Sequence, residues 1–370
     1  MMSFMAVAFA GNATTPRGLL TAGSRRGYSG AKRRGAVQFV EDPIETPASE
    51  FRDRSLGLLV FGVLEILVGF FCVLLVPLSL VAVSLTPTAG GGGVDLRSVL
   101  PGMVLYLVVA VVFIWLGIGS IRARRWARDL TLALSWIWLL TGVCTLLISW
   151  LVMPGLLLDL GADAGLSSGV VAVVALVSLL ILSFVYVLLP GAFVLFYRSE
   201  SVVATCRARD PRPQWTDDCP PRLLTLALLW ALTAVSVLVM PAYRCVTPFF
   251  GVLVDGAAGA VVWVIVLAVC VVLAWATCRR APWAWWMGIA ATLLAALSTL
   301  LTFARVEAVE LYRAMGLPKD QLALLADLAS PERWLMTLLW AAVWLSFLWY
   351  LVTLKNFFNS SPRRTSDPAT

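Results

Sequence analysis

"LGLLVFGVLEILVGFFCVLLVPLSLVAVSL", residues 56–85, is the stretch that decides the fold of this chain. Its only charged residue is Glu65, and every other position is apolar, glycine, proline, serine or cysteine. A helix needs about 20 consecutive apolar residues to cross roughly 30 Å of hydrocarbon. Residues 56–85 exceed that length, so they predict a transmembrane helix.

The composition of the whole chain agrees with this prediction. Hydrophobic residues make up 60% and charged residues 13% of the 370 positions, and the mean hydropathy is +0.90. Soluble domains carry roughly 45–50% apolar and about 25% charged residues. Lipid solvates such an excess of apolar surface, whereas water does not. The predicted fold class is all-α, a polytopic integral membrane helix bundle with the lipid bilayer as its permanent partner.

Seven further apolar runs are long enough to span a membrane, which predicts eight transmembrane helices. The predicted spans are residues 56–85, 99–121, 126–152, 169–197, 222–243, 252–278, 281–303 and 333–354. Pro77 lies in the first span and Pro190 in the fourth. Because proline removes a helical hydrogen bond and clashes with the preceding turn, we expect kinks in both.

The positions of the basic residues predict the orientation. Of the 28 Lys and Arg residues, 22 lie in the two tails and in alternate loops, and 6 lie in the other loops. Lys and Arg are enriched in cytoplasmic segments, so both termini are predicted to be cytoplasmic. The high usage of Ala, Val, Leu and Arg is typical of a GC-rich bacterial genome, which favours the cell membrane of a bacterium, the inner membrane, as the location.

Two similar offsets relate the first and second halves of the chain. A shift of 157 residues places Trp126 on Trp283, and a shift of 164 places Pro77 on Pro241. These matches favour a 4+4 parallel internal duplication, in which both halves share one orientation. Separate evolution of the two halves is the alternative.

These observations divide the chain into five predicted segments. They are a basic tail (1–54), the first four-helix half (55–199), a cytoplasmic connecting loop (200–221), the second four-helix half (222–355) and a disordered cytoplasmic tail (356–370). Residues 1–40 hold six basic residues and no acidic one. They are either an organelle-targeting segment or a disordered cytoplasmic tail. The second case allows for a start codon that was assigned too early.

Glu65 is the main candidate for a functional residue. It lies about ten residues into its span, which predicts a position close to the membrane midplane. A carboxylate there costs at least about 2.5 kcal/mol, so such a residue usually faces the bundle interior. Gly62 and Gly69 share its helix face and would let a neighbouring helix approach closely.

The partners expected for Glu65 are hydroxyl groups, because no Lys or Arg lies in the middle of another span. The candidate partners are the hydroxyls of the third span (Thr131, Ser135, Thr145 and Ser149), those of the seventh span (Thr292 and Thr299), and Tyr106 and Tyr186. Two interpretations remain open. Glu65 belongs to a substrate or proton path, or it makes an interhelical hydrogen bond that fixes packing.

The residue types present argue against several classes of function. The chain has no histidine, which excludes a Ser-His-Asp triad and a His metal site. We expect no catalytic residue, no metal, no cofactor and no nucleic acid partner. The arginine-rich loops are suited to anionic lipid headgroups, and a protein partner or a homo-oligomer stays open. The favoured function is a non-enzymatic structural or accessory membrane component, and the alternative is a small-molecule or proton-coupled transporter that uses Glu65.

Overall fold

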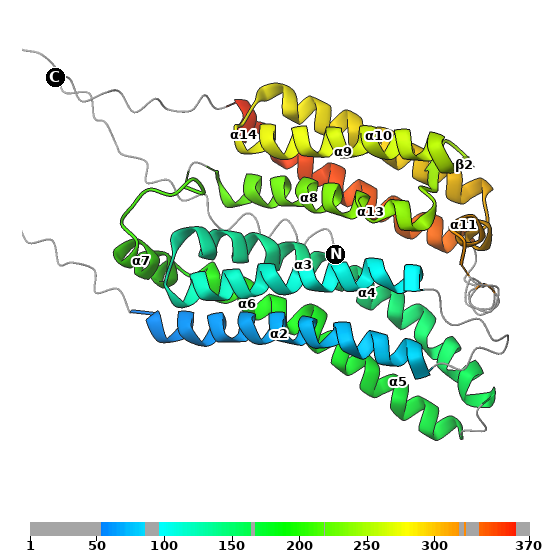
Figure 1. Ribbon diagram of the computed structural model, residues 1–370. Helices are drawn as coiled ribbons and strands as arrows, with labels where there is room; N and C mark the ends of the chain where they lie inside the picture. Colours follow the sequence, from blue (N-terminus) through cyan, green and yellow to red (C-terminus); the bar gives the residue numbers. More distant parts are fainter. Residues whose placement is uncertain are drawn as a thin grey trace, which may run out of the picture. The chain divides into compact units, whose positions relative to one another are not determined.

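The computed structural model describes residues 53–85, 96–163, 167–217, 219–317, 322 and 333–359 (Figure 1). All of these belong to one compact unit formed by residues 52–370. The predictions for residues 1–52 and 360–370, which concern the two tails, lie outside the described residues.

The first half of the chain folds as long helices. They are α2 (Ser55–Leu85), α3 (Leu96–Ile121), α4 (Arg125–Asp163), α5 (Ser168–Ser183) and α6 (Leu189–Tyr197), with a π-helical turn at Phe184–Leu188 between the last two. Asp53 caps the start of α2, since its carboxylate accepts the backbone N–H of Ser55 at 2.9 Å. This hydrogen bond lowers the pKa of Asp53.

The second half contains helices and one small sheet. Its elements are α7 (Glu200–Arg209), α8 (Pro221–Val237), a 3-10 turn (Met240–Tyr243), β1 (Thr247–Phe249), β2 (Val252–Val254), α9 (Gly256–Cys278), α10 (Pro282–Arg305), α11 (Ala308–Ala314), α13 (Arg333–Thr353) and α14 (Lys355–Asn359). Helix α7 lies within the predicted connecting loop 200–221.

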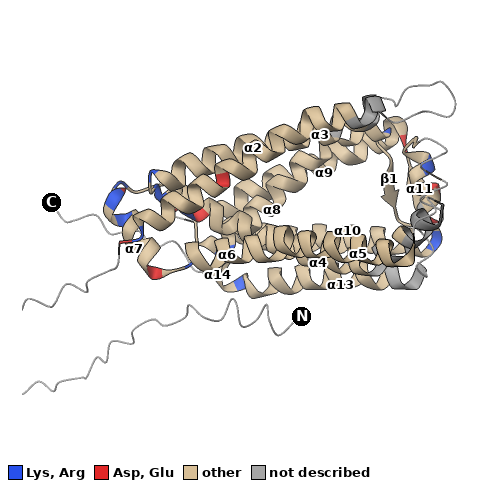
Figure 2. Ribbon diagram, turned by 90° about the horizontal axis from the view of Figure 1, so that it is seen from below, with Lys and Arg blue, Asp and Glu red and all other residues tan. Residues whose placement is uncertain are grey.

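Seven helical segments are long and apolar enough to cross a membrane, among the residues that the structure describes. They are α2, α3, α4, the continuous α5–α6 segment, α9, α10 and the α13–α14 segment. Large apolar side chains such as Phe70, Phe71 and Leu180 are exposed on these helices. Figure 2 shows most charged residues near the ends of the helices. These features fit a multi-pass membrane protein.

The region of the predicted fifth and sixth spans differs from the prediction. Helix α8 has 17 residues and ends at Val237, although the predicted span runs to residue 243. Residues 252–254, predicted to begin the sixth span, instead form β2, which pairs with β1 in an antiparallel hairpin. The fold is therefore all-α, as predicted, apart from this short hairpin. The apolar run there includes Pro248 and Gly251, which favour a turn over a helix.

The fourth predicted span is one continuous helical segment with an irregular turn before Pro190. The backbone N–H of Leu189 donates to the carbonyl of Phe184, five residues earlier. Such π-turns absorb the hydrogen bond that a proline removes. Pro77, in contrast, lies inside α2, which is helical on both sides of it.

Helices α2 and α3 pack closely through small residues. A methyl group added at Gly117 would lie 2.6 Å from the carbonyl oxygen of Gly62, and one added at Gly69 would lie 2.9 Å from the carbonyl oxygen of Ala110. The groove of small residues expected around Glu65 is thus present, and α3 is the helix that fills it. Close backbone approach of this kind drives helix association in lipid.

An aromatic cluster joins α2 to α6 and α7. The rings of Phe61 and Phe196 stack at 4.1 Å, and Phe61 meets Phe193 edge-on at 5.3 Å. Val202 and Cys206 of α7 belong to the same buried cluster. This cluster holds α7 against the end of the bundle and surrounds the polar site described next.

Candidate functional site

Glu65 is fully buried, with 0% of its surface exposed, and it is bonded to hydroxyl groups from two other helices. Tyr197, the last residue of α6, donates its hydroxyl to Glu65 Oε1 at 2.8 Å. Ser120 of α3 donates to Glu65 Oε2 at 3.1 Å. The two hydroxyl oxygens lie 2.9 Å apart, which closes a triangle of polar groups. This Glu65 cluster therefore ties α2, α3 and α6 together.

The two partners of Glu65 come from the ends of their helices. Ser120 and Tyr197 lie within one residue of the ends of α3 and α6. The expectation of a midplane position counted residues from the start of α2. The depth of Glu65 in the membrane stays a prediction.

Of the predicted partners, Thr131 lies next to Glu65, whereas Ser135, Tyr106 and Tyr186 do not bond to it. Ser135 is buried, but its hydroxyl donates to the carbonyl of Thr131 in its own helix at 2.6 Å. Tyr106 is 38% exposed on α3. Tyr186 lies in the π-turn, where its backbone packs against Gly142 of α4. None of the three hydrogen-bonds to Glu65, and whether any of them has a functional role stays a prediction.

Sequence reasoning missed Ser120 and Tyr197 because both lie at the ends of apolar runs. Arg122 follows Ser120 closely and Arg198 follows Tyr197 directly, so each reads as an interface residue. The signal that points to Tyr197 is the aromatic stretch Phe193–Tyr197, which shares a buried face with Phe61 of α2.

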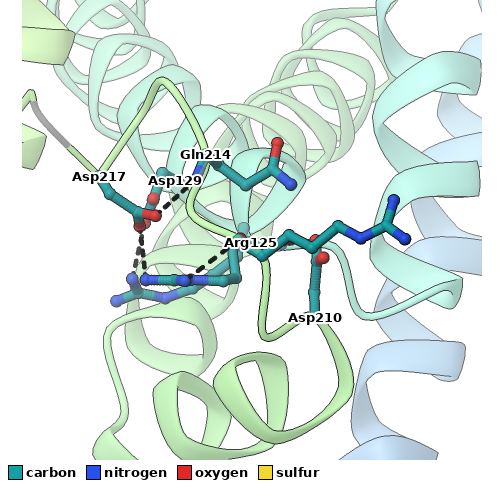
Figure 3. A network of polar contacts seen from close by, with 7 residues as sticks. Arg125, Asp129, Asp210, Gln214 and Asp217 are labelled. Atoms are coloured by element: carbon teal, nitrogen blue, oxygen red, sulfur yellow. Dashed lines mark hydrogen bonds and ion pairs between the residues drawn. The ribbon is translucent and has the colours of Figure 1, made fainter.

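A second polar group is an ion-pair network between the start of α4 and the segment after α7 (Figure 3). Asp210 is almost fully buried and accepts from the Arg124 guanidinium and the Arg125 backbone N–H, both at 3.4 Å. Arg125 also pairs with Asp217 at 2.8 Å. Asp217 in turn accepts the backbone N–H of Gln214 at 2.7 Å. These contacts fold the segment after α7 back onto the start of α4.

Arg128 connects the network to the Glu65 cluster. Its guanidinium donates to the backbone carbonyl of Tyr197 at 3.2 Å and pairs with Asp129 at 2.6 Å. Both side chains are largely buried, with 16% and 10% of the Arg128 and Asp129 side chains exposed. Tyr197 therefore has two separate contacts, one from its side-chain hydroxyl to Glu65 and one from its backbone carbonyl to Arg128.

Two further features of the site bear on its chemistry. The hydroxyl of Thr131 is buried next to Glu65. It makes no hydrogen bond of normal geometry among the residues that the structure describes. A shallow groove of about 500 Å³ lies on α7, lined by Glu200, Val203, Ala204 and Arg207. Glu65 is not among its lining residues. Within the described ranges, no three His, Cys, Asp or Glu side chains gather as metal ligands would.

The segment between α7 and α8 is also fixed by a thiol contact. Cys219 is buried beside Cys278 at the end of α9, and the interaction with this second thiol raises the pKa of Cys219. Both cysteines are free thiols. The contact therefore anchors the start of α8 to the end of α9.

Cys206 gives a pH dependence that can be measured. Burial raises the pKa of its thiol from 9.0 to about 11. Between these pH values the Cys206 thiol is ionised in the unfolded chain and protonated in the folded chain. The thiol therefore has no effect on the unfolding free energy below about pH 9 and lowers it by about 2–3 kcal/mol towards pH 11. We expect the Cys206→Ala variant to lack this part of the decline. Unfolding free energies of both proteins in detergent over this range provide the test, and identical pH profiles would contradict it.

Comparison of the chain with protein-family models, with curated proteins and with solved structures finds no match, so its function rests on this geometry.

Proposed function

We propose that this chain is a non-enzymatic, multi-pass component of the cell membrane, in which the Glu65 cluster serves assembly of the helix bundle. The observation that carries the proposal is the complete burial of Glu65 between two hydroxyl donors from α3 and α6. A substrate or proton path needs access from water, and this carboxyl has none in the structure. An interhelical polar contact in lipid contributes on the order of 1 kcal/mol and fixes which helices meet.

Glu65→Gln is expected to leave the protein folded, with a loss of less than about 1 kcal/mol, because the amide still accepts from Tyr197 or Ser120. Yield, gel-filtration profile and melting temperature in detergent measure this. Tyr197→Phe is the comparison variant, since it removes a hydroxyl from the same cluster and leaves the carboxyl in place. If Glu65→Gln abolished a cellular phenotype while folding stayed normal, the assembly role would be wrong.

That outcome would favour the alternative, a small-molecule or proton-coupled transporter. Two observations support the alternative. The π-turn at Phe184–Leu188 lies in the helix that carries Tyr197, and π-turns are frequent at functional sites. The buried Thr131 hydroxyl beside Glu65 has a free hydrogen-bonding capacity that a water or a substrate would satisfy.

The proposal includes eight spans, with α8 as the eighth. Helix α8 is apolar, packs along α9, and is bounded by the arginine-rich segment before it and by Arg244 after it. Eight spans place both termini in the cytoplasm, in agreement with the basic residues. Reporter fusions at residue 1 and after Thr370 should both report the cytoplasm. Opposite sides for the two reporters would show an odd number of spans.

The two halves pack in corresponding ways, which supports the proposed duplication. In the first half α2 packs on α3 and α4 packs on α6. In the second half α8 packs on α9 and α10 packs on α13. The tryptophans matched by the offset of 157 are each the second residue of their helix, Trp126 in α4 and Trp283 in α10.

Anionic lipid headgroups are the partner that we propose for the arginines around α7. Arg207, Arg209 and Arg212 are exposed there, and Arg124 keeps 46% of its side chain exposed. Each basic group near a membrane surface contributes about 1 kcal/mol of attraction to anionic lipid. Enrichment of anionic lipid in the purified protein would be reduced when these arginines are replaced by glutamine, and unchanged enrichment would exclude this role.

A further inference from the structure

The hairpin of β1 and β2 has an unusual turn. Its strands pair Phe249 with Val252, so Phe250 and Gly251 form a two-residue connection. Both have positive φ, 45° and 94°, as a type I′ turn requires. Asn or Asp normally precedes the glycine, because a bulky residue at positive φ is strained by about 1–2 kcal/mol. A phenylalanine is therefore a costly choice for a turn that faces water.

The polar groups of this turn are satisfied by a helix instead of by solvent. The backbone N–H of Phe250 donates to Ser298 Oγ and that of Gly251 to Thr302 Oγ1, both at 3.1 Å. Ser298 in turn donates to the carbonyl of Pro248 at 2.9 Å. Non-helical backbone survives at membrane depth only where protein groups satisfy it in this way.

The contacts with α9 and α10 place the hairpin inside the ends of these two helices. Ser298 lies seven residues before the end of α10, about 10 Å along the axis. At the base of the hairpin, Gly259 of α9 is in such close contact with the carbonyl of Cys245 that a Cβ would not fit. Figure 2 shows β1 across the end of the helices, close to α11. The hairpin therefore lies beside the last two turns of α10, and the side chain of Arg305, the final residue of α10, packs against Gly251 at the turn.

The outward surface of the hairpin is apolar. Phe249, Phe250 and Val252 are 41%, 37% and 55% exposed. No charged residue occurs between Arg244 and Asp255. Helix α9 also has exposed apolar side chains, among them Val261, Val264 and Ile265.

The length of α8 agrees with this position. Its 17 residues span about 25 Å, which is less than the hydrocarbon thickness of about 30 Å. The segment that follows α8 must therefore occupy the remaining depth or leave a gap in the bundle surface. An apolar hairpin fastened to α10 provides that segment.

We infer that the hairpin of residues 247–254 is a membrane-embedded element whose exposed residues Phe249, Phe250 and Val252 contact lipid acyl chains. It completes the fifth span from the side opposite the arginine-rich loops. This inference requires α9 and α10 to cross the membrane and does not depend on the role of Glu65.

Photocrosslinking tests the inference directly. p-Benzoylphenylalanine is introduced separately at Phe249 and at Val252, and the full chain is reconstituted in phosphatidylcholine vesicles, irradiated and analysed by mass spectrometry. Val264, an exposed residue in the middle of α9, is the lipid-facing control, and exposed Arg212 after α7 is the aqueous control. Gel filtration before irradiation confirms that each variant is folded.

We expect lipid adducts at both hairpin positions in a yield similar to that at Val264 and roughly tenfold above that at Arg212, because acyl chains are confined to the hydrocarbon region. Adducts at the Arg212 level would place the hairpin in water and overturn the inference. Crosslinks to a second copy of the chain in place of lipid would also overturn it, since the apolar surface would then be a protein interface. If only one of the two variants folds, the adduct yield at that position alone decides whether the hairpin contacts lipid.

Discussion

Gly117→Ala is expected to destabilise the protein by about 1–3 kcal/mol, although alanine is the better helix former. The added methyl would lie 2.6 Å from the carbonyl oxygen of Gly62 and 2.7 Å from the side chain of Ile66. A backbone oxygen cannot move aside as a flexible side chain can, so α2 and α3 must separate. This separation would also stretch the hydrogen bond between Ser120 and Glu65, which lies one turn further along the same helix pair.

Gly102→Ala is the matched control in the same helix, because a methyl there has no atom within 4 Å. Alanine should be neutral at Gly102 or stabilise by up to about 1 kcal/mol, through helix propensity alone. The two substitutions are chemically identical, but Gly117→Ala should lower the stability and Gly102→Ala should not. Melting temperature in detergent and the fraction of monodisperse protein measure both. Equal effects would show that α2 and α3 do not meet at Gly117.

The pattern of glycines around Glu65 made this helix pair predictable. Gly62, Glu65 and Gly69 recur at three- and four-residue steps, so the sequence alone predicts a face of small residues with a buried acid. The structure shows that face packed on α3. The identity of the facing helix was not predictable, because Gly117 is one of several glycines in apolar runs and nothing in the sequence pairs it with Gly62.

The partners of Glu65 were harder to predict because they depend on helix ends. Ser120 and Tyr197 each precede an arginine by one or two residues, and the sequence does not show that their side chains turn inward to Glu65. The hairpin was missed for a different reason. Residues 246–254 are as apolar as the spans, and a short apolar run does not distinguish a strand from a helix.

Arg128→Met is expected to cost about 3 kcal/mol, within the range for breaking a buried ion pair. The substitution keeps much of the apolar stem and removes the guanidinium. It would leave Asp129 buried without the partner at 2.6 Å and the carbonyl of Tyr197 without its donor. Because Tyr197 also holds Glu65, the loss should spread to the Glu65 cluster. A double-mutant cycle of Arg128→Met with Tyr197→Phe should then give less than the sum of the two single losses.

Arg124→Met is the control from the same connection, since Arg124 also pairs with an aspartate. Its side chain is 46% exposed and lies 3.4 Å from Asp210, so its loss should cost less than about 1 kcal/mol. Asp129→Asn in the Arg128→Met background should recover part of the stability, because it removes the unpaired buried charge. The measurement is the unfolding free energy of the wild-type protein, Arg128→Met, Arg124→Met and the double variant Arg128→Met with Asp129→Asn. If Arg128→Met were as mild as Arg124→Met, the contact from Arg128 to Tyr197 would contribute nothing to holding α4 and α6 together, and the Glu65 cluster would stand independent of the ion pairs beside it.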